Sequence, residues 1–293
     1  MARQRLGQHF LANAGWRERI ICAALSPSDR AALSPSDRAA LSPSDRAVRL
    51  PHAGHPASAD GVWIEIGAGH GEMTALLASQ ASHVVAIELD AKLLPALRAL
   101  ADRLGNVSVV SGDVLSMNLE DLAGGRRFRV YGNIPYYISS PIVHHLFARP
   151  ENLEAAFLVV QLEVAERLAA RPGCREYGYL SAFTQFYADS EILLRIPPGA
   201  FRPPPKVASA LVALRLPGQR VTLGVRDEPA FAEFLKGCFA QKRKTLRNNL
   251  RAMAPPGRAE LLLAECGVAR EARAEQLSLP EFARIFAGLH AGA

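Results

Sequence analysis

Cysteine is scarce in this chain, and long apolar runs are absent. The four cysteines among 293 residues, Cys22, Cys174, Cys238 and Cys266, are too widely spaced for a CxxC pair and too few for a disulfide framework. We therefore expect reduced, structural thiols and no metal site. No segment approaches the roughly 18 apolar residues of a membrane span, and no apolar stretch with a cleavage site follows the basic start MARQRLGQHF. These absences predict a soluble, cytoplasmic protein without membrane contact.

Apolar residues and positive charge are both plentiful. Hydrophobic residues make up 49% of the sequence, which is enough for one full-sized domain and a smaller second one. The 34 Lys and Arg residues exceed the 28 Asp and Glu residues, so the formal charge is +6. This balance favours a polyanionic partner.

A unit of the form LSPSDRA recurs three times over residues 25–47, with a period of eight. Solenoid repeats are about 20 residues or longer, because each unit must build its own apolar face, and this unit has a single leucine. We expect residues 25–60 to loop out at the surface, where added length costs little closure entropy. An amino-terminal segment and helix, residues 1–24, precede this insertion.

From Val62 onward, short apolar runs alternate with helical spacing. The predicted strands are 62–66, 83–90, 107–113, 128–133 and 154–161, and the predicted helices are 72–81, 91–104 and 163–170. This alternation indicates an α/β fold with a parallel sheet and right-handed crossovers. Two further β-rich runs, 191–198 and 207–216, predict a terminal hairpin on the sheet. We assign residues 61–217 to this catalytic domain.

The strand pattern ends near Gly218, and residues 218–293 predict a small all-helical domain. Residues 229–253 and 257–267 have helical spacing, and Ser278 and Glu281 form a capping box at the start of the last helix. Six cations and no acidic residue occupy 236–251: Lys236, Lys242, Arg243, Lys244, Arg247 and Arg251. If Phe239 and Leu246 anchor this helix, the cations form either a solvated face or a surface that contacts RNA phosphates.

A glycine-rich turn, GAGHG, follows the first predicted strand at the edge where α/β sheets bind ligands. Gly67, Gly69 and Gly71 let the backbone turn sharply and approach a ligand closely. A dinucleotide-binding motif would place another glycine at position 72, but Glu72 stands there and would repel a pyrophosphate. The turn therefore favours S-adenosylmethionine over NAD.

Acidic residues end the next two strands. Glu88 is positioned to accept hydrogen bonds from both ribose hydroxyls of a nucleoside cofactor, and Asp113 to accept one from the adenine amino group. Each carboxylate alone is equally typical of a helix cap or a solvated turn. Together with the glycine turn they favour a cofactor site.

The stretch GNIPYYISSP, residues 132–141, follows the fourth predicted strand and so faces the same crevice. The side-chain oxygen of Asn133 and the carbonyl of Ile134 can accept the two hydrogens of a nucleobase amino group, which directs its lone pair at a methyl donor. Pro135 fixes the turn, and Tyr136 offers a ring on which a flipped base can stack. The alternative is a proline turn with buried tyrosines.

The motifs GQHFL, EIGAGHGEMT, VVAIELD, SGDVL, GNIPYYISSPIV, EYGYLS, FRPPPKVASALV and QKRKTLRNNL resemble, in order, those of the ribosomal RNA adenine dimethyltransferases. The resemblance is strongest to the bacterial small-subunit members of this family. It implies a class I, Rossmann-like S-adenosylmethionine-dependent methyltransferase sheet with a helical C-terminal domain. It also implies transfer of methyl groups to N6 of two adjacent adenosines in the 3′-terminal hairpin of 16S ribosomal RNA, by a monomer acting in small-subunit biogenesis.

The resemblance also assigns residues to sites. Those that match the family's cofactor contacts are His9, Leu11, Gly67, Glu88, Asp113 and Asn133. Those that match its target-base pocket are Asn133, Ile134, Pro135, Tyr136 and a second stacking ring, Phe201. Two features depart from the pattern: His9 stands where the family usually has asparagine, and the repeat follows the amino-terminal helix.

Three other functions are compatible with parts of the pattern. One is an adenine methylase of the same family that acts on another ribosomal RNA. A second is a ribosome-assembly factor that binds RNA without catalysis, although such a protein has no need of the methyl-donor crevice. The third, a small-molecule methyltransferase, leaves the basic segment without a purpose.

Overall fold

The computed structural model describes residues 9–25 and 61–290. Apart from Leu25, the repeat and the predicted loop at 25–60 lie outside these residues. The amino-terminal helix predicted within residues 1–24 is α1, Ala14–Leu25. None of the helices in the described ranges is both long enough and apolar enough to cross a membrane.

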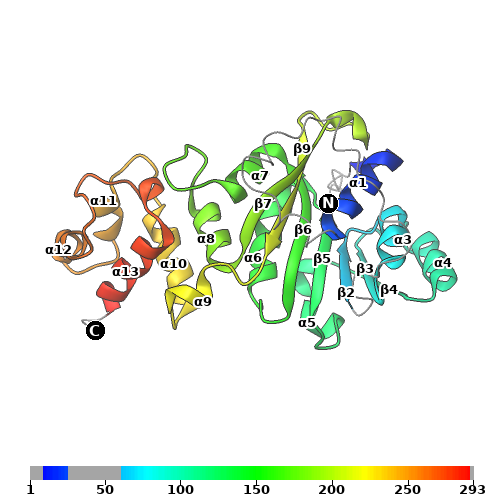
Figure 1. Ribbon diagram of the computed structural model, residues 1–293, viewed down its shortest axis with the longest axis horizontal. Helices are drawn as coiled ribbons and strands as arrows, with labels where there is room; N and C mark the ends of the chain where they lie inside the picture. The colour runs from blue at the N-terminus through cyan, green and yellow to red at the C-terminus, as the bar shows by residue number, and fades with distance from the viewer. Residues whose placement is uncertain (1–8, 26–60, 291–293) are drawn as a thin grey trace, which may run out of the picture. The chain divides into compact units, whose positions relative to one another are not determined.

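A sheet of seven strands, in the order β4-β3-β2-β5-β6-β9-β7, forms the framework (Figure 1). Neighbouring strands from β4 to β6 all pair in parallel. The strands are β2 Val62–Ile66, β3 His83–Glu88, β4 Val107–Ser111, β5 Phe128–Asn133, β6 Leu153–Gln161, β7 Asp189–Ile196 and β9 Ser209–Arg215. The predicted parallel α/β sheet is confirmed, and the two runs predicted as a hairpin are neighbours at its end.

Helices and short 3-10 turns connect these strands. They are α3 Glu72–Ala78, α4 Leu94–Leu104, η1 Val114–Ser116, α5 Leu119–Leu122, η2 Tyr136–Ile138, α6 Ser139–Phe147, α7 Leu162–Ala169 and η3 Pro198–Ala200. Helix α3 packs on β3, on α1 and on α4, and α4 packs on β4. Because the connected strands are parallel, the loops that leave β2, β3 and β5 meet at one edge of the sheet.

A second, two-stranded sheet pairs the amino-terminal β1, Phe10–Leu11, with β8, Phe201–Arg202, in antiparallel register. The backbone amides of Ala12 and Asn13 extend the pairing by donating to the carbonyl of Ala200 at 3.0 and 3.2 Å. This small sheet holds the amino terminus beside residues that are distant in sequence.

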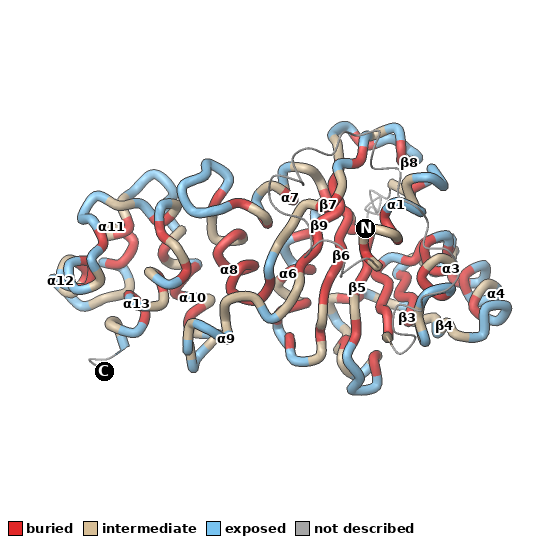
Figure 2. Tube along the Cα trace, viewed as in Figure 1, coloured by how far each residue is buried: buried red, intermediate tan, exposed pale blue. Residues whose placement is uncertain are grey.

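Apolar side chains of the central strands form the core. Figure 2 colours many residues of these strands as buried. Every residue of β2 is buried, and the Trp63 ring stacks on Phe157 of β6 at a centroid distance of 5.7 Å. Strands buried on both faces read as nearly continuous apolar runs, and in β2 the one interruption is Glu65, which is also buried.

By contact density the chain divides into two compact units. One contains the described residues up to Leu162 together with Ile192–Ala213, and the other contains Glu163–Glu191 together with the residues from Leu214 onward. The sequence pattern placed the boundary between 217 and 218, close to the junction between Ala213 and Leu214. It did not indicate that residues 163–191 group with the C-terminal helices.

The second unit has its own aromatic core, in which Phe231, Phe234 and Phe286 pack on one another. Its helices, in addition to α7, are α8 Tyr179–Tyr187, α9 Arg220–Leu223, α10 Glu228–Cys238, α11 Leu246–Leu250, α12 Arg258–Glu265 and α13 Leu279–His290, with a 3-10 turn η4 at Ala274–Gln276. One bond of the predicted capping box is present: Glu281 accepts from the Ser278 amide at 2.8 Å, and it also accepts from the Ser278 hydroxyl at 2.6 Å.

The prediction of one continuous helix over residues 229–253 is wrong. Helix α10 ends at Cys238, residues 239–245 form turns, and α11 begins at Leu246. Tertiary contacts break the helix: the Leu246 amide donates to Ala272 at 2.8 Å, and the Asn249 side chain donates to the carbonyl of Cys238 at the end of α10. These bonds satisfy backbone groups that a continuous helix would have paired internally.

Candidate active site

The glycine turn joins β2 to α3 and has the conformation its composition predicts. Gly67, Gly69 and Gly71 have φ angles of 74°, 60° and 87°, which side chains other than glycine rarely adopt. The amides of Gly67 and Ala68 both donate to the Ile87 carbonyl at the end of β3, at 2.9 and 3.0 Å. A Cβ at Gly67 would meet only the Asn133 carbonyl, 4.0 Å away, so it would project into open space.

Glu88 ends β3 and is 2% exposed. One of its carboxylate oxygens accepts from the Gly69 amide and the other from the Asp90 amide, both at 2.7 Å. The carboxylate is thereby fixed against the glycine turn. Each oxygen retains capacity for a further hydrogen bond, as recognition of a ribose diol requires.

Asn133, the last residue of β5, is held by the amino-terminal segment. Its side-chain nitrogen donates to the backbone carbonyl of His9 at 2.8 Å. Because this bond uses the donor end of the amide, the oxygen is the end that remains to accept. The Ile134 amide donates to the Val159 carbonyl at 3.0 Å and so ties the NIPY turn to the neighbouring strand.

The Tyr136 ring is supported on two sides. Its ring lies against the His9 imidazole, with centroids 5.6 Å apart and an interplanar angle of 29°, and its hydroxyl lies 3.1 Å from that of Ser209. The Nδ1 atom of His9 is in turn 2.7 Å from the carbonyl of Pro203. Tyr136 is therefore fixed before any substrate binds.

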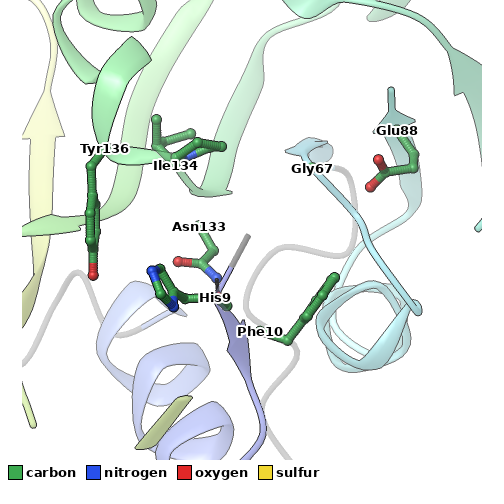
Figure 3. Close-up of a pocket in the computed structure, with 8 residues that line it drawn as sticks. His9, Phe10, Gly67, Glu88, Asn133, Ile134 and Tyr136 are labelled. Carbon is green, nitrogen blue, oxygen red and sulfur yellow. Dashed lines mark hydrogen bonds between the residues drawn. The ribbon is translucent and has the colours of Figure 1, made fainter. Parts of the chain in front are cut away.

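These side chains surround one pocket of about 490 Å³, a volume that includes its open mouth (Figure 3). The lining residues are His9, Phe10, Gly67, Glu88, Asn133, Ile134, Pro135 and Tyr136. Figure 3 shows Tyr136 and His9 at one side of the pocket, and Gly67 and Glu88 at the other. The structure thus brings together the predicted NIPY stretch, the glycine turn and the carboxylate after β3.

Phe10 lines the pocket although the sequence reasoning did not select it. Its ring packs edge-on against His70 at 4.9 Å and lies over the glycine turn, where a Cβ at Gly69 would approach it to 3.2 Å. The signal available in the sequence was its position next to His9. A two-residue strand has no periodicity that would reveal such a placement.

Other predicted site residues lie outside this pocket. Leu11 and Phe201 are 7% and 2% exposed, are partners in the β1–β8 pair, and belong to the apolar core. Asp113 is exposed, and its carboxylate caps η1 by accepting from the Leu115 amide at 3.0 Å. Gly69 shapes the turn without lining the pocket. In these positions Phe201 does not present a second stacking ring to it.

A buried polar group that the sequence reasoning missed lies in the strands beneath the glycine turn. Glu65 of β2 is 2% exposed and accepts a hydrogen bond from the Thr74 hydroxyl at 2.5 Å. The pKa of Glu65 is raised to about 8: burial is the largest cause, the Thr74 bond opposes it in part, and the nearby carboxylates of Glu88 and Glu72 add to it. Tyr131 is the register partner of Glu65 on β5, and its hydroxyl is buried without a hydrogen-bond partner among the described residues.

The predicted phosphate-contacting cations belong to the second unit. Lys242, Arg243 and Lys244 are exposed in the turns between α10 and α11, not on a helix face, and Arg247 is partly buried. The two outer cations of the segment are paired: Lys236 lies 3.2 Å from Glu233, and Arg251 forms an ion pair with Glu260. Phe239 and Leu246 do anchor the segment, since Leu246 is fully buried and Phe239 packs on Tyr177 and Phe282.

A parallel sheet with a glycine turn after β2, a carboxylate after β3 and an NIPY turn after β5 is the arrangement of a Rossmann-like methyltransferase. Residues 1–290 match the family Ribosomal RNA adenine dimethylase, and the chain belongs to this family. A protein of Acidobacterium capsulatum named ribosomal RNA small subunit methyltransferase A is 46% identical over 225 residues, which cover 76% of this chain and 79% of the relative. One of the same name from Pelotomaculum thermopropionicum is 36% identical and covers 97% of this chain and 90% of the relative.

Two solved structures share the fold across both units. A dimethyladenosine transferase from Plasmodium falciparum superposes with a TM-score of 0.72 at 23% identity, over 94% of this chain and 96% of that one. The 23S rRNA methyltransferase ErmE superposes with a TM-score of 0.65 at 24% identity, over 96% and 99%. The predicted class I sheet with a helical C-terminal region and the predicted family are both confirmed.

Proposed function

We propose that this chain transfers methyl groups from S-adenosylmethionine to N6 of two adjacent adenosines in the 3′-terminal hairpin of 16S ribosomal RNA. The observation that carries this proposal is the orientation of the Asn133 side-chain amide. Its nitrogen is engaged by the His9 carbonyl at 2.8 Å, so its oxygen is oriented to accept from a substrate amino group in the pocket.

The pocket residues fit the cofactor. Glu88, with a further acceptor site on each oxygen, would hold the ribose hydroxyls, and the space that a Cβ at Gly67 would fill admits the methionine part. Asp113 and Leu11 do not line the pocket. Asp113 would contact the adenine of the cofactor, and Leu11 would act through strand β1, which supports the pocket. When bound, S-adenosylmethionine supplies an electrophilic methyl group on a positively charged sulfur.

The chain's own residues activate and position the adenine. An exocyclic amino group is a poor nucleophile because its lone pair is delocalised into the ring. Acceptance of its two hydrogens by the Asn133 side-chain oxygen and the Ile134 carbonyl favours a more pyramidal nitrogen. His9 covers one face of Tyr136, so the base would stack on the opposite face. The methylated nitrogen then loses its proton to water, and positioning supplies most of the rate enhancement.

The substrate is proposed from the family and from charge. Both relatives are named as small-subunit methyltransferases, and the exposed Lys242, Arg243 and Lys244 are suited to phosphate contact. We propose that the protein acts as a cytoplasmic monomer on the small ribosomal subunit or its precursor.

The test is methyl transfer from labelled S-adenosylmethionine to small subunits that lack this modification, followed by digestion of the RNA to nucleosides. We expect dimethyladenosine confined to the 3′-terminal hairpin. Dimethyladenosine in large-subunit RNA would indicate the related methylase instead. Subunit binding without transfer would indicate an assembly factor.

A further inference from the structure

Tyr137 is the one phenylalanine, tyrosine or tryptophan side chain in residues 9–25 and 61–290 that is exposed, at 60%. It follows Tyr136 in the 3-10 turn η2, directly after the pocket-lining NIPY turn. Within those same residues its hydroxyl has no hydrogen-bond partner, and its ring packs on no other aromatic ring. Neither the proposed activation of the adenine nor the packing of the core uses this side chain.

A second exposed apolar side chain lies on a chain segment that contacts the NIPY turn. Val207 is 47% exposed and lies two residues before Ser209, whose hydroxyl is 3.1 Å from that of Tyr136. That contact joins the η2 segment to the segment after β8. The two exposed apolar residues are thus on chain segments that meet at the pocket.

The charge of these two segments favours a nucleic acid. Residues 133–141 and 201–209 contain no acidic residue, and the second segment contributes the exposed cations Arg202 and Lys206. An exposed aromatic ring with neighbouring cations is the combination by which proteins bind single-stranded nucleic acid, since the ring stacks on a base and the cations attract the phosphates.

The proposed reaction creates a need for such a ring. Moving an adenosine out of its stack leaves the adjacent base without a stacking partner, which is unfavourable. An aromatic side chain one residue from the pocket can replace the lost stacking. We infer that the Tyr137 ring stacks on the nucleobase adjacent to the flipped adenosine. This contact thereby contributes to the selection of two target adenosines that are adjacent in sequence. This inference rests on the proposed function.

The experiment compares Tyr137→Phe, Tyr137→Leu and Tyr137→Ala in methylation of unmodified small subunits. We expect Tyr137→Phe to match the unaltered enzyme, and Tyr137→Ala and Tyr137→Leu to raise KM for the subunit about tenfold. The kcat should change less than about twofold, because the contact is made equally in the ground and transition states. Affinity for S-adenosylmethionine, measured by calorimetry, should be unchanged. Val221→Ala on α9, where Val221 is 64% exposed, is the matched control for loss of an exposed apolar side chain.

A second measurement isolates the stacked base. Subunits are reconstituted with 16S RNA in which the nucleotide on the 5′ or the 3′ side of a single remaining target adenosine is abasic. For the unaltered enzyme one of these substitutions should raise KM about tenfold, and for Tyr137→Ala the same substitution should add nothing.

The possible outcomes distinguish a failure of the stacking role from a failure of the proposed function. A Tyr137→Ala enzyme with unchanged KM, a Tyr137→Leu enzyme equal to the unaltered one, or additive effects of the variant and the abasic site would each overturn the stacking role while methylation persists. No methylation by the unaltered enzyme would overturn the proposed function, and the inference with it.

Discussion

At the scale of single residues, the side chain of Asn133 is oriented by a hydrogen bond to a residue 124 positions away in the sequence. The carbonyl of His9 takes up the donor end of its amide, so orientation of the acceptor end does not depend on substrate. This arrangement also bears on His9 itself: the contact uses the backbone, which is the same for histidine and asparagine, while the imidazole packs on Tyr136. The departure at His9 therefore leaves the support of Asn133 intact.

Replacement of Asn133 tests this role. We expect Asn133→Ala to lower the single-turnover methylation rate by about a hundredfold or more, by analogy with removal of one oriented hydrogen-bonding group from other active sites. The melting temperature and affinity for RNA should be nearly unchanged. Asn133→Asp is the companion variant: it retains acceptor oxygens, loses the donor to His9 and adds a negative charge, and it should keep more activity than Asn133→Ala. Unchanged single-turnover rates for Asn133→Ala would contradict the assignment.

Glu65 makes the stability of the protein depend on pH. Its pKa is raised by burial from 4.5 to about 8, so the folded protein retains a proton that the unfolded chain releases. The folded state then binds more protons than the unfolded state between these values, and the free energy of unfolding falls as pH rises through this window. Below about pH 4.5 the full contribution is present, and above about pH 8 it is lost.

The variant Glu65→Gln removes this titration and can still accept from the Thr74 hydroxyl. We expect its melting temperature to vary less between about pH 5 and 8 than that of the unaltered protein, with an advantage that grows toward pH 8. Calorimetry at several pH values measures the difference. Glu151→Gln, at an exposed position just before β6, is the control. Parallel pH profiles for Glu65→Gln and the unaltered protein would refute a neutral Glu65.

At the scale of elements, the glycine turn also packs against helix α4. Gly71 has φ of 87°, and a Cβ there would overlap the side chain of Leu100 and lie 3.1 Å from Leu97, both on α4. The turn between β2 and α3 therefore packs against helix α4, and its residue Gly67 also lines the pocket. Glycine at position 71 allows both the positive φ and the close approach of α4, and α3 begins at the next residue.

A pair of glycine substitutions separates these effects. Gly105 has a similar φ of 77°, but no atom of the described residues lies within 4 Å of the position that a Cβ would take there. Gly105→Ala should cost only the backbone strain, about 1–2 kcal/mol. Gly71→Ala should cost more and should also weaken binding of S-adenosylmethionine. Urea unfolding and calorimetric titration measure both effects, and equal losses for the two variants would show that contact with α4 is unimportant.

At the scale of the whole molecule, the pocket and the exposed cations between α10 and α11 fall in different compact units. The pocket belongs to the unit that contains the sheet, and the exposed cations Lys242, Arg243 and Lys244 belong to the helical unit. An excess of six positive charges over the chain favours association with RNA in general. The catalytic and the RNA-binding contributions should therefore be separable by mutation.

The triple variant Lys242→Gln, Arg243→Gln, Lys244→Gln tests this separation. We expect weaker RNA binding, and a slope of log affinity against log salt that is shallower by about 2, because each lost phosphate contact removes about 0.7–0.9. Affinity for S-adenosylmethionine should not change. Lys236→Gln, at a cation that already pairs with Glu233, is the control and should have a smaller effect. A slope identical to that of the unaltered protein would mean that the turn does not contact RNA.

Local sequence patterns were enough to predict the parallel α/β sheet, the glycine turn, the carboxylate after β3 and the NIPY stretch after β5. These features are readable because their causes are local: strand burial sets apolar runs, positive φ selects glycine, and parallel strands bring their following loops to one edge. The same local logic predicted the capping box at Ser278.

The way in which distant segments complete the site depends instead on tertiary contacts. The pairing of β1 with β8 places His9 and Phe10 at the pocket and Phe201 in the core, and a two-residue strand carries no pattern that would predict this. The break between α10 and α11 likewise depends on Ala272 and Asn249, which satisfy backbone groups across the fold. Such contacts depend on which surfaces meet after the chain collapses, and no window of neighbouring residues contains that information.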